Sequence, residues 1–241
     1  MLAQVGIGLQ FLMQKIRTKI SKASIYQFEN FFHFISLNES FSSSYSNKDQ
    51  LDLVSNTVKN DSIKLIDITH YNSPPSIIPI KYYDKSIKAK YLETNSKISR
   101  SISEDISFDK KITVVYPKHE NLSQIINYDE IKIYHTNHFT KLYNYLKGQL
   151  NNYEGFSFFI NLSDTSFEVI IFNNNKFVFF NSFNINNKNE FLYYTFFLLK
   201  NYHGSTTSDK IIFLGKLIPI FLYEITFSYF ELYFSVLKHK R

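Results

Sequence analysis

The chain of 241 residues has no cysteine, no tryptophan, and only six glycines and five prolines. Without cysteine, the protein has no disulfide framework, no thiolate nucleophile and no cysteine-ligated metal site. The absence also fits a reducing compartment such as the cytoplasm. The shortage of glycine bears on nucleotide binding, because loops that cradle phosphate groups use glycine to bring the backbone close to the ligand.

Apolar and aromatic residues are plentiful. Hydrophobic residues make up 44% of the chain and aromatic residues 18%, with 25 phenylalanines and 18 tyrosines. Such a composition supplies a core and argues against global disorder. The accompanying excess of Asn, Lys and Ile is typical of an AT-rich genome, which explains the aromatic content better than selection for an aromatic function.

The net charge of +6 could indicate an anionic partner such as nucleic acid or a membrane surface. The basic residues are spread along the chain, and their largest local group is Lys238, His239, Lys240 and Arg241. We interpret this group as a solvated terminus. Nucleic-acid binding is therefore kept only as an alternative.

Two apolar stretches raise the question of membrane insertion. Residues 1–13 lack the positive region and the cleavage site of a signal peptide, and we expect a first strand there. Residues 218–237 contain Glu224, Glu231 and Pro219, whereas a spanning helix needs about 20 residues with few charges. We predict a buried helix and strand, no transmembrane segment, and a cytoplasmic protein.

The C-terminal third has the clearest pattern. Strands are predicted at residues 156–162, 166–172 and 176–183, with the second turn formed by Asn173, Asn174 and Asn175. A helix capped by Asn186 or Asn187 and ended by Gly204 follows. The remaining predicted elements are a strand at 210–214, a turn at Gly215, a helix at 217–227 and a strand at 229–237. The strands at 176–183 and 210–214 flank a helix, which favours a parallel pair between them.

The N-terminal part repeats this order more loosely. The predicted elements are strands at 4–14, 19–28 and 30–36, a helix at 47–60 capped by Asn47, a strand at 62–69, a loop at 72–79, a helix at 84–95, a strand at 130–135 and a helix at 137–150. An insertion is expected around residues 96–127, with one strand at 111–116.

The order strand-strand-strand-helix-strand-helix-strand is that of a ribonuclease-H-like unit. We therefore predict an α/β fold with two such units facing each other, as in actin, sugar kinases and heat-shock ATPases. The first unit would cover residues 1–150 and the second residues 156–241, joined by a linker at 151–155.

Several short motifs resemble the family called domain of unknown function 3822. They are Asn181-Ser182-Phe183, Glu190-Phe191-Leu192-Tyr193-Tyr194, Phe213-Leu214-Gly215, Ile78-Pro79 with Tyr82 and Tyr83, and the strand from Leu9 to Met13. The resemblance spans nearly the whole chain and implies an actin-like fold. It implies no activity, because the family is uncharacterised.

An actin-like ATPase needs two phosphate-binding hairpin turns with Asp and Gly, and a glycine pair near the adenosine. The first turn, residues 14–18, has neither Asp nor Gly. The second retains Ser163, Asp164 and Thr165 but no Gly, and the adenosine position has the single Gly215. These four residues are the candidate nucleotide site, with Mg-ATP as the only cofactor that the fold suggests. Their degeneracy argues against hydrolysis.

Other activities have weaker support. A ribonuclease-H-type nuclease needs clustered carboxylates, and the strand at 156–162 contains none. His135 and His138 are three residues apart, without a carboxylate at a ligand spacing, so no metal site is predicted. No Gly-x-Ser-x-Gly elbow indicates a serine hydrolase.

The leading hypothesis is a non-catalytic actin-like protein that binds a protein partner and has degenerate phosphate loops. The alternatives are a nucleotide-dependent ATPase or kinase with divergent loops, and a basic surface that binds nucleic acid.

Overall fold

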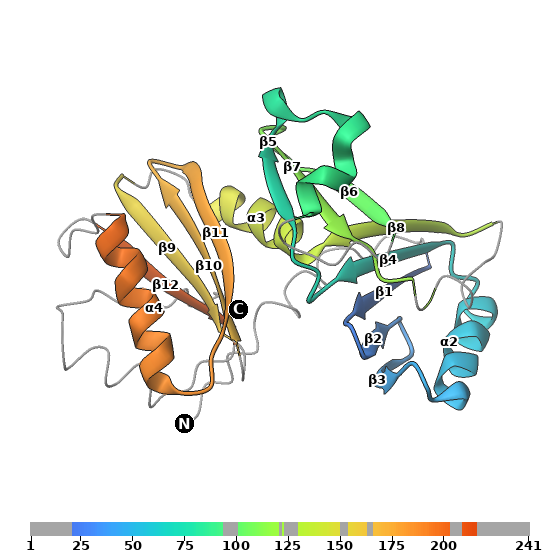
Figure 1. Ribbon diagram of the computed structural model, residues 1–241. Helices are drawn as coiled ribbons and strands as arrows, with labels where there is room; N and C mark the ends of the chain where they lie inside the picture. Colours follow the sequence, from blue (N-terminus) through green and yellow to red (C-terminus); the bar gives the residue numbers. More distant parts are fainter. Residues whose placement is uncertain are drawn as a thin grey trace. The chain divides into compact units, whose positions relative to one another are not determined.

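The computed structural model describes residues 21–93, 101–120, 122, 130–149, 154–162, 166–202 and 209–215. Contacts divide the chain into two compact units, with one boundary between Leu146 and Lys147. Each unit contains a mixed sheet with helices, so the chain is α/β as predicted (Figure 1). The two units are described separately below.

The first unit is built on a five-stranded sheet in the order β3-β2-β1-β4-β8. Strands β1 to β3 form an antiparallel meander, while β4 is parallel to β1 and β8 is parallel to β4. The strands are β1 (Lys22–Gln27), β2 (Phe31–Ile35), β3 (Ser40–Ser44), β4 (Leu65–His70) and β8 (Lys132–Asn137). Four of them were predicted within a few residues, and β3 was missed.

Helix α2 (Lys48–Asn60) covers one face of this sheet and begins where predicted. The side chain of Asn47 caps it, because its Oδ1 accepts a hydrogen bond of 3.3 Å from the backbone N–H of Gln50. Val54 and Val58 of the helix are buried against a core from the sheet that includes Ala23, Ile25, Phe32, Phe34, Ile66 and Ile68. This packing confirms the predicted apolar face of the helix.

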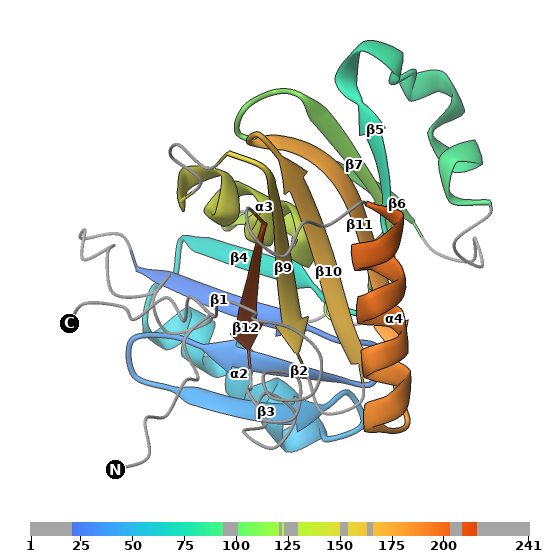
Figure 2. The ribbon, with the colours of Figure 1, turned by 90° about the vertical axis from the view of Figure 1, so that its left-hand side faces the viewer.

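An antiparallel sheet of three strands, in the order β5-β7-β6, also belongs to the first unit (Figure 2). Its strands are β5 (Ser76–Pro79), β6 (Ile102–Ile106) and β7 (Ile112–Pro117), and two 3₁₀ helices follow β5, namely η1 (Ile80–Tyr82) and η2 (Lys85–Leu92). The predicted strand at 111–116 is confirmed as β7. The predicted loop at 72–79 was wrong in part, because Ser76–Pro79 pairs with β7.

The prediction of a helix at 84–95 was also wrong in part. Asp84 caps it as expected, but the segment is 3₁₀ and is interrupted by a non-helical residue at Ile87. Leu92 packs into a small core with Ile78 and Val115. The non-helical backbone of Ile87, with φ −109° and ψ 20°, interrupts the hydrogen-bond series that a regular α-helix needs.

Helix α3 (His138–Gln149) directly follows β8. Residues Phe139, Leu142, Tyr145 and Leu146 were predicted to face inward. Phe139 and Leu146 are buried, but Leu142 and Tyr145 are only half-buried. Tyr143 is buried instead, and its hydroxyl donates to Asp109 Oδ2 at 2.9 Å.

The second unit contains a four-stranded sheet in the order β11-β10-β9-β12, from β9 (Phe156–Leu162), β10 (Ser166–Asn173), β11 (Lys176–Asn184) and β12 (Lys210–Gly215). The predicted meander of β9, β10 and β11 is confirmed. Asn174 and Asn175 form its second turn with φ values of 46° and 63°. Asparagine tolerates this left-handed backbone, which tight hairpins require.

Helix α4 (Lys188–Asn201) packs on the sheet of the second unit, and the side chain of Asn187 caps it. The predicted parallel pairing of β11 with β12 was wrong. Strand β12 pairs in parallel with β9, and β11 lies at the opposite edge of the described sheet. The connection through α4 therefore crosses over β10 and β9, which places β12 beside the first strand of the meander.

Several predictions lie outside the described residues. They are the strand at 4–14, the helix at 217–227, the strand at 229–237 and the helix end at Gly204. Both mixed sheets place a meander beside a parallel strand, in the orders β3-β2-β1-β4 and β11-β10-β9-β12. The interpretation of both as ribonuclease-H-like units stays a prediction. None of the described helices is long and apolar enough to cross a membrane.

Candidate functional site

The strands next to the candidate nucleotide residues in the sequence, β9 and β12, are neighbours in the sheet of the second unit. Strand β9 ends at Leu162, immediately before the turn, and β12 ends at Gly215, which is the register partner of Leu162. The two strands are parallel, so their carboxyl ends share an edge, where ligands of α/β sheets usually bind. Ser163, Asp164 and Thr165 lie outside the described residues, and their role stays a prediction.

A cross-strand polar pair lies beside that turn. The side-chain amide of Asn161 on β9 donates a hydrogen bond of 2.9 Å to Glu168 Oε2 on β10. The two residues are direct register partners. Glu168 therefore already accepts a hydrogen bond from the protein itself, and the pair holds the base of the hairpin together.

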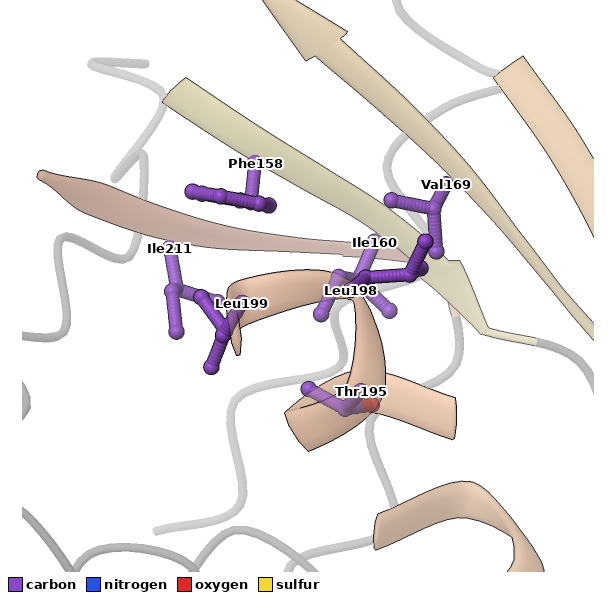
Figure 3. Close-up of a pocket in the computed structure, with 7 residues that line it drawn as sticks. All are labelled: Phe158, Ile160, Val169, Thr195, Leu198, Leu199 and Ile211. Carbon is purple, nitrogen blue, oxygen red and sulfur yellow. The ribbon is translucent and has the colours of Figure 1, made fainter. Parts of the chain in front are cut away.

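A small space between α4 and the sheet of the second unit is apolar (Figure 3). Its lining residues are Phe158, Ile160, Val169, Thr195, Leu198, Leu199 and Ile211. The hydroxyl of Thr195 is the one polar side-chain group among them, and it has no hydrogen-bond partner within the described residues. A single hydroxyl is too few donors to hold a phosphate, so we interpret the space as imperfect packing between α4 and the sheet.

Three histidines meet at the carboxyl ends of β4 and β8 in the first unit. His70 Nε2 lies 3.0 Å from His135 Nδ1, and the backbone N–H of His119 donates to His70 Nδ1 at 3.3 Å. Since Nδ1 of His70 accepts, we assign its proton to Nε2, which then donates to His135. His119 is anchored in turn, because its Nε2 donates to the carbonyl of Tyr71 at 2.8 Å.

Burial strongly affects the acidity of two of these rings. Desolvation, followed by the neighbouring His135, His119 and Lys118, lowers the pKa of His70 to about 3. Desolvation, followed by Lys118, lowers the pKa of His135 to about 4. Both rings are therefore neutral near pH 7, as their hydrogen bond requires.

Of the two histidines noted in the sequence, His135 and His138, only His135 belongs to this cluster. His135 pairs with His70 from the neighbouring strand, while the ring of His138 stacks on Tyr71 with centroids 4.2 Å apart. Sequence reasoning missed His70 and His119, because only the register of β4 and β8 brings the first of them to His135. In the part of the chain that the structure describes, no three His, Asp or Glu side chains form a group that could hold a metal ion.

A lysine from α3 reaches the end of β4. Lys141 Nζ lies 2.9 Å from Asp67 Oδ2 and donates to Thr69 Oγ1 at 2.6 Å. Lys22 of β1 also lies 3.6 Å from Asp67 Oδ2. The carboxylate of Asp67 is therefore held between two lysines of the protein.

Asp105, at the end of β6, connects three elements. Its Oδ2 accepts a hydrogen bond of 2.7 Å from the backbone N–H of Asn137, and its Oδ1 accepts one of 3.2 Å from the hydroxyl of Tyr116. Desolvation raises the pKa of Asp105 to about 6, although these donors act in the opposite direction. A carboxyl group of this kind could exchange a proton near neutrality.

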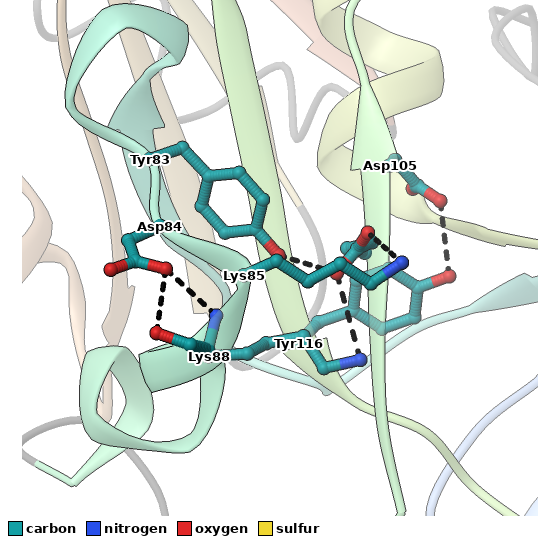
Figure 4. A network of polar contacts seen from close by, with 8 residues as sticks. Tyr83, Asp84, Lys85, Lys88, Asp105 and Tyr116 are labelled. Atoms are coloured by element: carbon teal, nitrogen blue, oxygen red, sulfur yellow. Dashed lines mark hydrogen bonds and ion pairs between the residues drawn. The ribbon is translucent and has the colours of Figure 1, made fainter.

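Glu104, the neighbour of Asp105 on β6, contacts side chains from the segment that contains η2, of which Figure 4 labels Tyr83, Lys85 and Lys88. The hydroxyl of Tyr83 donates to its carboxylate, which also forms ion pairs of 3.5 Å with Lys85 and 3.6 Å with Lys88. The hydrogen bond from Tyr83 is the main reason that the pKa of Glu104 is lowered. This cluster attaches η2 to the three-stranded sheet.

These carboxylates share one property. Asp67, Glu104, Asp105 and Glu168 each accept hydrogen bonds or ion pairs from the protein itself. An ATPase or a nuclease needs carboxylates that converge on a metal ion. The arrangement described here stabilises the fold and has no such convergence within the described ranges.

Comparison with known proteins identifies the family and the fold. The model of a family described as "Protein of unknown function (DUF3822)" matches residues 11–231. No curated protein matches the sequence. The chain is similar in structure to a Bacteroides thetaiotaomicron protein with an actin-like ATPase fold and unknown function, with a TM-score of 0.69 and 14% identity over 90% of each chain. This similarity shows that the chain has an actin-like ATPase fold.

Two weaker similarities carry no argument about function. The first is to a chain of the PilM-PilN type IV pilus biogenesis complex, with a TM-score of 0.45, 9% identity, and coverage of 79% of this chain and 70% of that one. The second is to apo psk41 ParM, with a TM-score of 0.41, 10% identity, and coverage of 92% and 93%.

Proposed function

The chain belongs to the DUF3822 family of proteins of unknown function, and we propose that it is a non-catalytic, cytoplasmic actin-like protein that acts by binding another protein. The observation that carries the proposal is that hydrogen bonds and ion pairs within the protein already occupy the carboxylates. The carboxylates of Asp67 and Asp105, the chemical group that a metal ion would need, are held by lysines or by donors of the protein itself. The absence of glycine from both predicted phosphate turns supports the same conclusion.

The first test is a thermal-shift titration of the full chain with Mg-ATP and Mg-ADP, combined with an assay for phosphate release. A ligand present at ~100 times its dissociation constant stabilises a protein by about 2.7 kcal/mol, which moves the melting temperature by several degrees. We expect no shift at millimolar nucleotide and no phosphate release. A saturable shift with release of phosphate would overturn the proposal.

The second test concerns the partner. The purified full chain, immobilised and exposed to extract of its own cells, should retain one protein in a stoichiometric amount after washing. The complex should form again from the two purified proteins without added nucleotide. If neither protein binds the other in that reconstitution, the proposed role in protein binding is wrong.

Nucleotide binding by divergent loops is the second candidate, and one observation favours it. Gly215 lies in register with Leu162, so the two predicted phosphate and adenosine elements start from the same edge of one sheet. In this case Asp164 would orient a metal-bound water, and Ser163 and Thr165 would contact phosphate. Asp164→Ala should then abolish a thermal shift that the unaltered chain shows. An identical shift in both proteins would exclude this role of Asp164.

A further inference from the structure

The β6–β7 turn of the first unit exposes a phenylalanine. Phe108 is 86% exposed and lies in the turn from Ser107 to Lys110, which is closed by a hydrogen bond of 2.9 Å from Lys110 N to Ser107 O. Lys110 has a φ of 54°, the left-handed conformation that often completes such a hairpin. The turn geometry therefore directs this large apolar side chain into solvent.

The turn is held firmly from within. The hydroxyl of Ser107 donates to Asp109 Oδ1 at 2.7 Å and accepts from the backbone N–H groups of Lys111 and Ile112 at 3.2 Å each. The backbone N–H of Phe108 donates to the side chain of Asn144 at 2.8 Å. Asp109 also accepts from the hydroxyl of Tyr143. Its carboxylate thus faces the protein, while the phenylalanine faces away from it.

A second exposed segment lies beside this turn. The backbone N–H of Ile80 donates to the carbonyl of Lys111 at 2.9 Å, which places η1 next to the turn. Ile80 is 39% exposed and Tyr82 is 66% exposed. Lys81 lies over the Tyr82 ring, with its Nζ 4.5 Å from the ring centroid. We name this region the tip surface, and it consists of Ile80, Lys81, Tyr82, Phe108, Lys110 and Lys111.

The charge of the tip surface has one sign. Its charged members are three exposed lysines, Lys81, Lys110 and Lys111. The carboxylates nearest to it in sequence accept hydrogen bonds from the protein, Asp109 from Ser107 and Tyr143 and Asp84 from Ser86. Single exposed apolar residues are common on soluble proteins, but here Phe108 and Tyr82 are exposed on the same surface as the three lysines.

We propose that the tip surface binds an anionic lipid membrane, with Phe108 inserted among the lipid chains and the lysines against the headgroups. We favour a membrane over a protein partner because the same surface carries an exposed phenylalanine and several exposed lysines, which fit the acyl chains and the anionic headgroups of a lipid surface. Tyrosine and lysine are residues that settle at the lipid headgroup level. The proposal is independent of the protein-binding role proposed above.

The absence of tryptophan gives a direct test. Phe108→Trp introduces a single tryptophan at the tip surface. Its fluorescence should shift to the blue when vesicles of phosphatidylcholine and phosphatidylserine are added, and should not shift with phosphatidylcholine alone. The matched control is Leu37→Trp, since Leu37 is 94% exposed in the β2–β3 turn but is followed by Glu39 instead of lysines. The control should show no shift.

Vesicle co-sedimentation measures the strength of binding. Phe108→Ser should weaken the partition of the full chain into anionic vesicles by about tenfold. The double variant Lys110→Glu and Lys111→Glu should weaken it by at least about twentyfold. Lys48→Glu combined with Lys132→Glu makes the same change in net charge elsewhere in the unit and should reduce binding much less. High salt should release the unaltered protein.

The altered side chains are exposed, so the variants should keep the melting temperature of the unaltered protein. Failure of the unaltered chain to bind anionic vesicles would overturn the proposal. Equal binding by Phe108→Ser, or equal fluorescence shifts for the two tryptophan variants, would do the same. If Phe108→Ser abolished binding to a purified protein partner while vesicle binding was unchanged, the tip surface would be a protein interface instead.

Discussion

His70 and His135 form a hydrogen bond of 3.0 Å between ring nitrogens from two neighbouring parallel strands. The bond needs one ring to donate and the other to accept, so a proton added to His135 Nδ1 would destroy it. The side chain of His70 is fully buried. The protonation of this pair therefore links the stability of the first unit to pH.

We predict that the first unit loses stability as the pH falls from about 6.5 towards 4. The pKa values of His70 and His135 are lowered to about 3 and about 4, so the unfolded chain binds protons in this range that the folded chain does not. Stability is present above the unfolded pKa and is lost below it. The loss should reach about 2 to 3 kcal/mol for each histidine near pH 4.

Urea unfolding at a series of pH values measures this effect. His135→Asn is the informative variant, because its amide oxygen can accept the hydrogen bond from His70 but does not titrate. The variant should lose less stability between pH 6.5 and 4 than the unaltered chain. Parallel curves for the two proteins would show that the histidine pair does not control acid sensitivity.

Asp105 should have the opposite effect on the pH dependence of stability. Its pKa is raised to about 6, so the folded chain binds a proton between pH 4 and 6 that the unfolded chain releases. Its contribution to stability is present below pH 4 and is lost as the pH rises through 6. Asp105→Asn keeps an acceptor for the backbone N–H of Asn137 and removes this titration.

The measurement is the change in unfolding free energy between pH 5 and pH 8. Relative to the unaltered chain, the unfolding free energy of Asp105→Asn should gain about 1.4 kcal/mol more on going to the higher pH. Asp109→Asn changes the same kind of group in the neighbouring turn and controls for a general effect of charge removal. An equal pH dependence in Asp105→Asn and the unaltered chain would contradict the assigned role of Asp105.

The elements that the sequence predicted well have local signals. Asn47 and Asn187 cap their helices where the apolar spacing begins, and Asn174 and Asn175 mark a turn by tolerating positive φ. Strand β3, with the sequence Ser-Phe-Ser-Ser-Ser, has no such signal. It becomes a strand because β2 supplies hydrogen-bond partners along its length, which no local pattern records.

The polar sites could not be predicted, for a related reason. His70 and His135 are 65 residues apart, and Asp105 is 32 residues from Asn137. Periodicity indicates which face of a strand is apolar, but not the register of β4 and β8 that brings His70 to His135. It also does not indicate the packing between two different sheets that brings Asp105 on β6 to Asn137 on β8. The wrong pairing of β11 with β12 has the same origin, because the order of strands depends on long-range packing.

Replacement of Thr195 by valine should stabilise the second unit. Its side chain is 5% exposed among apolar residues, and the hydroxyl has no hydrogen-bond partner among the residues described. Valine has nearly the same shape without the buried polar group, so the gain should be about 1 kcal/mol. Thr195→Ser is the control, because it keeps the hydroxyl and loses a methyl group; it should be less stable than the unaltered protein. Chemical denaturation that ranked valine below threonine would show that the hydroxyl has a partner.

The caps of α2 and α4 should respond differently to aspartate. Asn47→Ala and Asn187→Ala should each cost about 1 kcal/mol, because each removes the acceptor for a backbone N–H in the first helical turn. Asn47→Asp restores that acceptor and should recover the loss, since a negative charge is favourable at a helix N-terminus.

At Asn187 the side-chain amide also donates to Glu190 Oε1 at 3.3 Å, so an aspartate there would place two carboxylates together. Asn187→Asp should therefore recover less than Asn47→Asp at pH 7. Equal recovery at the two positions, measured by chemical denaturation at pH 7, would show that the contact between Asn187 and Glu190 contributes nothing in solution.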